Sequence, residues 1–244
     1  MAPAPLPLLG TFHELSIVAA DVRATVEFYE RLGFTQATTS DTYSHPYGVL
    51  TDGRLFLGVH RRGGPSPVLT FVRPGVAASV ADFEAAGIEL SVRRTGEEEF
   101  NEIGFSDPDG QAVAVLEART YSPVDRGVQE VSLCGDFAEV SLPCADFAAA
   151  QAFWEPLGFV AAEEAQSPYP HLMLTSDRLD LAFHSPRFLA QPMLVFRNPE
   201  MPARLAGLAE RNIALSPAPR GSGAGAALLT SPDGTPLLLL PETS

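Results

Sequence analysis

The sequence contains no lysine. All 16 of its basic residues are arginine, against 30 aspartates and glutamates, which gives a formal charge of −14. The phosphate backbones of nucleic acids and the surfaces of anionic membranes attract basic patches, so this acidic balance argues against both. We therefore expect a protein with no nucleic-acid partner and no membrane partner.

Cysteine is scarce, and long apolar runs are absent. Cys134 and Cys144 are the only cysteines, and they lack the CxxC or Cys/His spacing of a metal site. No apolar stretch approaches the roughly 20 residues that span a bilayer. The opening MAPAPLPLLG lacks the basic segment of a signal peptide. These absences predict a cytoplasmic protein with reduced thiols, and an extended tail over residues 1–10.

The chain repeats itself. The stretch FHELSIVAADVRATVEFYERLGF, residues 12–34, aligns with FAEVSLPCADFAAAQAFWEPLGF, residues 137–159. Likewise VLTDGRLFLGVH, residues 49–60, aligns with MLTSDRLDLAFH, residues 173–184, and each copy closes on a PDG turn before an apolar strand. Blocks in the same order at nearly constant spacing indicate an internal duplication.

Both copies predict the same order of elements. In the first copy a strand leads to Asp21, a good helix N-cap, and the helix ends at Gly33, a good C-terminal residue. Three strands follow and the pattern restarts at Val68, so each copy contains two βαβββ units and the fold class is α+β. The predicted domains are residues 11–119 and 135–244, with a linker at residues 120–134.

Three motifs resemble the vicinal oxygen chelate superfamily, which includes glyoxalase I, bleomycin-type resistance proteins and extradiol dioxygenases. They are the strand running into Asp21, the FYERLGF of the first helix and the DPDG turn before the last strand. The resemblance covers both copies. It implies that each copy forms a curled eight-stranded mixed sheet, with helices outside, that cups a small ligand. Because one fold serves many chemistries, the resemblance does not identify the reaction.

In metal-dependent members of this superfamily, four inward strand positions hold one divalent ion. The resemblance places these positions on the first strand at Glu14, on the fifth at Val68 and on the eighth at Ala114. On the fourth strand the positions are Leu57 in the first copy and Leu181 in the second. The first, fifth and eighth strands of the second copy carry Glu139, Met193 and Leu238 at these positions. One carboxylate rarely holds a catalytic ion against water. We therefore expect no metal in either copy and no cofactor.

Two nearby residues offer a different ligand set. Glu117 lies three positions beyond Ala114, and an odd separation on a strand turns it to the opposite face of the sheet. His13 precedes Glu14 directly, so alternation turns it toward the helix-covered face. If a site nevertheless assembles, Glu14 with His13 or Glu117 would hold Zn, Ni, Mn or Fe.

The inner face of the first sheet, here called the N-terminal cup, is the predicted ligand site. Its predicted lining combines small and polar inward positions with the polar-tipped aromatics of the segment TYSHPYG: Glu14, Ser16, Tyr43, His45, Tyr47, Thr70 and Ala114. The same segment would also suit an ordinary turn. A buried Glu14 must meet a donor, a ligand or water. It is either paired with an arginine across the sheet or a candidate catalytic acid or base.

The second sheet repeats the pattern in a more apolar setting, the C-terminal cup. Glu139 and Ser141 correspond to Glu14 and Ser16, while Met193 and Leu238 are expected to crowd the space, so we predict a mainly structural role. A histidine ends the fourth strand of each copy, at His60 and His184. Each is either a strand-end histidine that bonds locally or a general base.

The sequence favours a metal-free protein that binds, sequesters or converts a small organic metabolite or antibiotic in the N-terminal cup. We expect it to be a monomer or a homodimer. The main alternative is a divalent-metal-dependent enzyme, either a glyoxalase-type lyase or an extradiol-type dioxygenase. A third alternative is an interaction module that uses the acidic surface, although the run GEEEFNE, residues 96–102, lacks EF-hand spacing.

Overall fold

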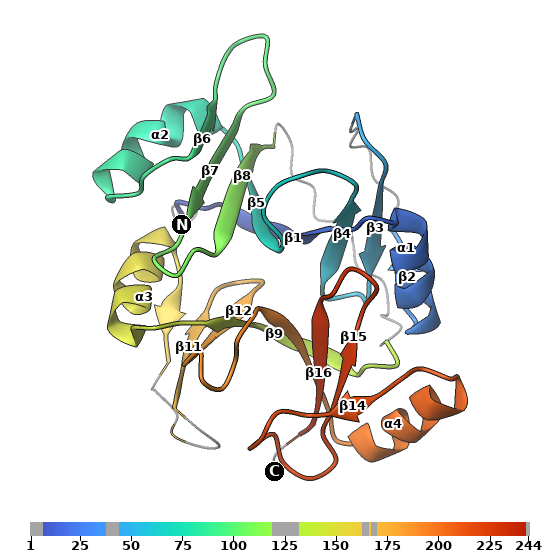
Figure 1. Ribbon diagram of the computed structural model, residues 1–244. Coiled ribbons are helices and arrows are strands. Elements are labelled where there is room, and N and C mark those ends of the chain that lie inside the picture. Colours follow the sequence, from blue (N-terminus) through green and yellow to red (C-terminus); the bar gives the residue numbers. More distant parts are fainter. Residues whose placement is uncertain (1–6, 38–43, 119–131, 163–165, 167–169, 243–244) are drawn as a thin grey trace, which may run out of the picture.

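Each copy of the repeat forms one eight-stranded mixed sheet, as Figure 1 shows for the computed structural model. The structure describes residues 7–37, 44–118, 132–162, 166 and 170–242. The predicted pocket residue Tyr43 lies outside these residues, as do most of the predicted tail and most of the predicted linker.

The two sheets have equivalent strand orders and are open at both ends. The first sheet consists, in spatial order, of β2 (Thr35–Gln36), β3 (Tyr47–Thr51), β4 (Phe56–His60), β1 (Thr11–Val18), β5 (Val68–Arg73), β8 (Ala112–Glu117), β7 (Glu102–Ser106) and β6 (Val92–Arg94). The second consists of β10 (Val160–Ala161), β11 (His171–Thr175), β12 (Asp180–His184), β9 (Asp136–Pro143), β13 (Met193–Asn198), β16 (Pro236–Pro241), β15 (Ala227–Thr230) and β14 (Ser216–Pro217). The predicted α+β class and the two mixed sheets are confirmed.

One helix follows the first strand of each βαβββ unit and packs against strands of its own sheet (Figure 1). The helices are α1 (Val22–Arg31), α2 (Val76–Ala85), α3 (Phe147–Trp154), which continues into the 3₁₀ turn η1 (Glu155–Leu157), and α4 (Met201–Glu210). Asp21 caps α1 as predicted, because its carboxylate accepts a hydrogen bond from the amide of Ala24 at 3.0 Å. None of the helices among the described residues is long and apolar enough to cross a membrane.

The central strand of each sheet contains a β-bulge. Strand β1 pairs with β5 in antiparallel register, and this register shifts between Phe12 and Glu14, which leaves His13 as the extra residue. The second sheet shows the same shift where β9 meets β13. Strand alternation cannot be counted across a bulge, so the strand register does not test the orientation predicted for His13.

The two sheets share one buried apolar cluster that runs through both halves. The first helix of each copy contributes one fully buried aromatic residue, Tyr29 on α1 and Trp154 on α3. Trp154 reaches the DPDG turn of the other half, where its Nε1–H donates to Oδ2 of Asp107 at 3.4 Å. Rings also meet across the halves, as Phe34 does with Phe196 at a centroid distance of 6.2 Å.

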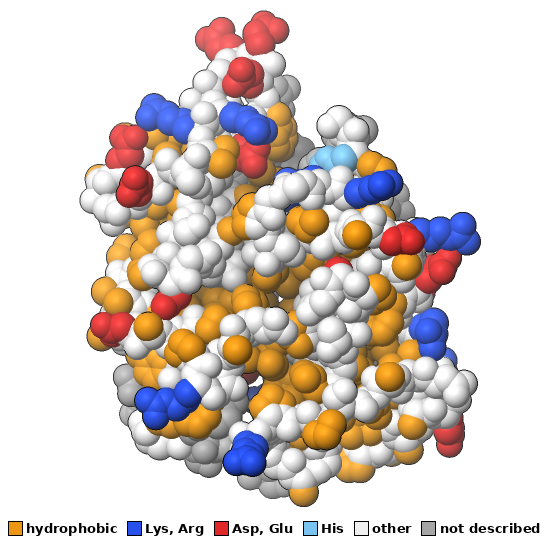
Figure 2. Space-filling model, viewed as in Figure 1, with side chains coloured by type: hydrophobic (Ala, Val, Ile, Leu, Met, Phe, Trp, Pro, Cys, Tyr) orange, Lys and Arg blue, Asp and Glu red, His pale blue; other side chains and the backbone are white. Residues whose placement is uncertain are grey.

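The outermost parts of the molecule give little support to the interaction-module alternative. The edge strands are two or three residues long, which leaves little backbone for a partner strand. The acidic run at residues 96–99 forms the exposed tip between β6 and β7, where Figure 2 shows acidic side chains at the top of the molecule. A solvated hairpin tip of this kind is an ordinary location for a charge run.

We predict that the contact between Trp154 and Asp107 stabilises the packing of the two halves. Trp154→Phe keeps most of the ring but removes the N–H donor, and should lower the free energy of unfolding by about 1 kcal/mol. Trp154→Ala should lower it by about 3–5 kcal/mol, because a large cavity remains. Urea denaturation measures both, with the exposed Val160→Ala as a control expected within about 0.5 kcal/mol of the parent. A Trp154→Ala protein as stable as this control would contradict the prediction.

Candidate functional site

The N-terminal cup is organised around Glu14, which lies on β1 between β4 and β5. Its side chain is buried, with only 3 % of the residue exposed. One carboxylate oxygen, Oε1, accepts a hydrogen bond from Oγ of Ser16 at 2.6 Å and lies 3.3 Å from Nε2 of His60. Ser16 in turn lies 2.9 Å from the hydroxyl of Thr70 on β5. The predicted polar positions on these strands therefore meet in one hydrogen-bonded cluster.

Two aromatic residues extend this cluster away from Glu14. The Nδ1 atom of His60 lies 3.1 Å from Nε2 of His45, and the ring of Tyr47 stacks on the His60 ring at a centroid distance of 6.0 Å. His60 is buried, whereas His45 and Tyr47 are partly exposed. Glu14, His60 and His45 thus form a continuous chain from a buried carboxylate toward the surface.

The surroundings of Glu14 favour its ionised form. Burial alone would raise the pKa of the Glu14 carboxyl, but hydrogen bonds from His60 and Ser16 and the nearby charges of His13 and His60 outweigh it, so the pKa is lowered. When Nε2 of His60 carries a proton, this N–H can donate a hydrogen bond to the carboxylate of Glu14, and Nδ1 of His60 can accept one from Nε2 of His45. Burial and the neighbouring His60 and Arg62 lower the pKa of His45, which favours its neutral form.

Glu117, which the sequence predicts to face away from Ala114, contacts the start of helix α2. Its two carboxylate oxygens accept hydrogen bonds from the amides of Gly75 and Val76 at 2.7 and 2.9 Å. These amides begin helix α2, where a carboxylate satisfies unpaired donors and complements the helix dipole. Glu117 therefore does not contribute to the N-terminal cup.

The C-terminal cup contains the same residue types in a different arrangement. Ser141 lies between its neighbours, with Oγ 3.2 Å from Oε1 of Glu139 and 3.1 Å from Nε2 of His184. Arg197 lies 4.0 Å from Glu139, so the arginine partner that the sequence analysis considered for Glu14 is present for the equivalent glutamate of this half. The predicted crowding is present as an apolar cluster on this sheet: Leu189, Met193, Val195 and Leu238.

The pKa values of the equivalent glutamates in the two cups are shifted in opposite directions. Burial raises the pKa of Glu139, although Arg197 and Ser141 oppose this effect. Burial, with the nearby charges of His171 and Arg197, lowers the pKa of His184 to about 4. The surroundings in the C-terminal cup therefore disfavour charge on Glu139 and His184, whereas those in the N-terminal cup favour the ionised form of Glu14.

The fourth-strand position predicted from the sequence, Leu57, is wrong. His60 was predicted only as one of two alternatives, a locally bonded histidine or a general base. Leu57 pairs with Leu15 in parallel register and belongs to the apolar core, so it does not face Glu14. The neighbouring alternate positions Gly58 and His60 lie on the Glu14 side. The matching VH and FH ends of the fourth strands in the two copies were the available signal for His60.

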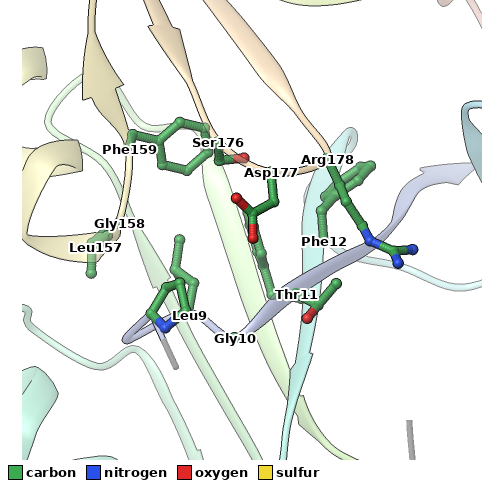
Figure 3. Close-up of a pocket in the computed structure, with 12 residues that line it drawn as sticks. Leu9, Gly10, Thr11, Phe12, Leu157, Gly158, Phe159, Ser176, Asp177 and Arg178 are labelled. Carbon is green, nitrogen blue, oxygen red and sulfur yellow. The ribbon is translucent and has the colours of Figure 1, made fainter. Parts of the chain in front are cut away.

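A second feature, a cavity of about 80 Å³, lies at the seam between the halves (Figure 3). Its walls include Leu9, Phe12 and Phe159, and Figure 3 shows the carboxylate of Asp177 pointing into it. Phe12 pairs with Phe71, while Glu14 pairs with Thr70 after the bulge, so the cavity lies on the opposite face of β1 from Glu14. The cavity and the N-terminal cup are therefore separate sites.

The residues of the N-terminal cup do not match the superfamily's metal-binding set. Glu14 and His60 could supply two donors, since 3.3 Å separates their nearest atoms. The fifth-strand position is Val68, which pairs with Ser16, and the eighth-strand position is Ala114, which pairs with Thr70. Neither an alanine nor a valine side chain can bind a metal ion. Within the described part of the chain, no group of three or more His, Cys, Asp or Glu side chains could hold a metal ion.

The fold is shared with solved extradiol dioxygenases. A homoprotocatechuate 2,3-dioxygenase variant from B. fuscum, in complex with HPCA, matches with a TM-score of 0.64 and 17 % identity over 100 % of this chain and 73 % of that one. The 2,3-dioxygenase LapB from Pseudomonas sp. KL28 matches with a TM-score of 0.65 and 14 % identity over 99 % and 94 %. A catechol 2,3-dioxygenase matches at 0.63 and 13 % over 98 % and 89 %. No family model and no curated protein sequence matches the chain.

These matches confirm the resemblance to the vicinal oxygen chelate superfamily at the level of the fold. They also correct the expectation that no cofactor is needed. The matched structures are extradiol dioxygenases, which are metal-dependent members of the superfamily. The matched proteins are enzymes of a type that the sequence analysis gave as its main alternative.

We predict opposite effects on stability for Glu14→Gln and Glu139→Gln. The lowered pKa of Glu14 adds stability above the unfolded-state pKa, and this contribution disappears as the pH falls through the folded-state pKa. Glu14→Gln should therefore cost about 1–3 kcal/mol at pH 7 and less in acid. The raised pKa of Glu139 works in the other direction, so Glu139→Gln should be neutral or stabilising at pH 7. Chemical denaturation at several pH values measures both, and equal losses would contradict the prediction.

Proposed function

We propose that this chain, which has the fold of the extradiol dioxygenases, is an enzyme that converts a small organic molecule in the N-terminal cup. The observation that supports this proposal is the chain of contacts from the ionised, buried Glu14 through His60 to His45. The structural matches support an enzyme in preference to a carrier protein. We place the reaction among glyoxalase-type lyases and extradiol-type dioxygenases.

The contact chain is suited to proton transfer. When His45 removes a proton from a bound molecule, it can pass its Nε2 proton to Nδ1 of His60. The resulting imidazolium lies 3.3 Å from the carboxylate of Glu14, which stabilises the positive charge. Transfer between positioned groups of this kind contributes about 10²–10⁴-fold to a reaction rate. Glu14 would thus act by orienting His60 and balancing its charge.

This chemistry indicates the class of substrate. The molecule should carry an acidic C–H or O–H group that loses a proton early in the reaction, such as a 2-oxo compound or a catechol. Catechols are the first compounds to test, because the matched structures include a catechol 2,3-dioxygenase. The partly exposed Tyr47, stacked on His60, could provide a flat surface for such a ring.

Binding without turnover is the second candidate function. It is favoured by the lack of any three-donor group of His, Cys, Asp or Glu within the described residues. In that case the N-terminal cup would sequester a metabolite or antibiotic, and Glu14 would serve as a hydrogen-bond acceptor for the ligand. Saturable binding that leaves the compound chemically unchanged under every metal condition would identify this function.

We also propose a cytoplasmic location, a monomeric or homodimeric state, and no nucleic-acid partner. Both cysteines, Cys134 and Cys144, are buried and unbridged, as reducing conditions would leave them. The net charge of −14 disfavours binding to nucleic acid. Analytical ultracentrifugation of the purified protein would determine the oligomeric state.

We predict that turnover depends on Glu14 and not on Glu139. The assay uses catechols and 2-oxoaldehyde adducts with the protein supplied separately with Fe²⁺, Mn²⁺, Ni²⁺ or Zn²⁺, or treated with a chelator. Under the condition that gives turnover, Glu14→Gln should lower kcat/KM by about 100-fold or more, because His60 loses its charged partner. Glu139→Gln, the equivalent change in the C-terminal cup, should leave it within a few-fold. The reverse pattern would move the active site to the C-terminal cup.

A further inference from the structure

The two cups hold a glutamate, a serine and a histidine at equivalent positions, but the contacts between them differ. In the N-terminal cup, Oε1 of Glu14 lies 3.3 Å from Nε2 of His60. In the C-terminal cup, Oγ of Ser141 bridges the glutamate and the histidine at 3.2 and 3.1 Å. A difference near the glutamate must account for this change.

The residue beside the serine on the fourth strand is one such difference. Ser16 pairs with Gly58 on β4, and Ser141 pairs with Ala182 on β12, so the two positions are equivalent in register. A Cβ atom added to Gly58 would lie 2.3 Å from Oε1 of Glu14 and 2.6 Å from its carboxyl carbon. Such distances are far inside van der Waals contact. The Glu14 carboxylate therefore occupies the space that a side chain at Gly58 would fill.

The backbone gives no other reason for a glycine here. Gly58 is absent from the glycines with positive φ, so alanine could adopt its conformation. Glycine weakens the interior of a strand, and its presence there often marks the close approach of another group. Ala182, at the equivalent position of β12, carries the missing methyl group and is fully buried, so the equivalent strand of the other sheet accepts alanine there.

We propose that Gly58 is a positioning residue that lets the Glu14 carboxylate lie against β4 and contact His60 directly, and that Ala182 prevents the same contact in the C-terminal cup. One methyl group thereby separates a glutamate in direct contact with histidine from a serine-bridged pair. The effect on turnover rests on the proposed function, whereas the effect on the contact does not.

The reciprocal variants Gly58→Ala and Ala182→Gly test this inference. Carboxyl-carbon NMR follows the titration of each glutamate, and the imidazole ¹⁵N shifts report the contact at Nε2. In Gly58→Ala we expect the titration midpoint of Glu14 to rise by about one unit or more, with loss of the ¹⁵N signature of a carboxylate-bonded His60. In Ala182→Gly the midpoint of Glu139 should fall.

The other charged neighbours are unchanged by these substitutions. They are His13 beside Glu14, and Arg197, His171 and Asp180 around Glu139. A shift that appears in only one half, on the side of the substitution, therefore reports the local contact. Each variant serves as the control for the other, because both change one methyl group on a fourth strand.

The outcomes separate this inference from the proposed function. Titration shifts in both variants without any turnover would support the positioning role and count against the enzyme. A loss of turnover in Gly58→Ala with an unchanged Glu14 titration would overturn the positioning role and leave the enzyme. If Gly58→Ala does not fold, Ala182→Gly decides alone, and an unchanged Glu139 titration there would overturn the inference.

Discussion

A carboxylate at the centre of a sheet must be surrounded by donors and positive charge, because burial of an unpaired charge is costly. Glu14 meets this requirement through Ser16 and His60, and the rest of the N-terminal cup follows from it. Thr70 supports the serine, and His45 supports the histidine from the other side. Removing Ser16 or His60 would leave the buried Glu14 carboxylate with fewer donors.

The duplication shows how the same framework supports two different sites. Each copy places a glutamate on its first strand after a bulge, and a histidine at the end of its fourth strand. Folding requires the bulge and the strand order, because they set which side chains enter the apolar core. The inner faces are less constrained, so one became a polar cluster and the other an apolar one with an arginine beside Glu139.

The sequence contained enough information to predict the fold and the position of Glu14, but not the contacts of Glu14. The repeated blocks, the Asp21 cap and the DPDG turn are local signals. The odd spacing between Ala114 and Glu117 on one strand is another, and it predicted that Glu117 faces away from the cup. The register between β1 and β4 depends on residues that are far apart in the sequence. Leu57 was therefore predicted to face Glu14, whereas its neighbours Gly58 and His60 do so. The role of Gly58 depends on where the Glu14 side chain goes, and no local pattern reveals that.

A shared fold does not imply a shared site. At 13–17 % identity, the matches reflect strand order and apolar packing, which do not depend on inward donors such as those missing at Val68 and Ala114. A buried glutamate is different, because it reduces stability unless its neighbours compensate. The arrangement of Glu14, its donors and the glycine that accommodates it is more than packing requires. For this reason the contacts of Glu14 carry more weight for function than the positions where donors are missing.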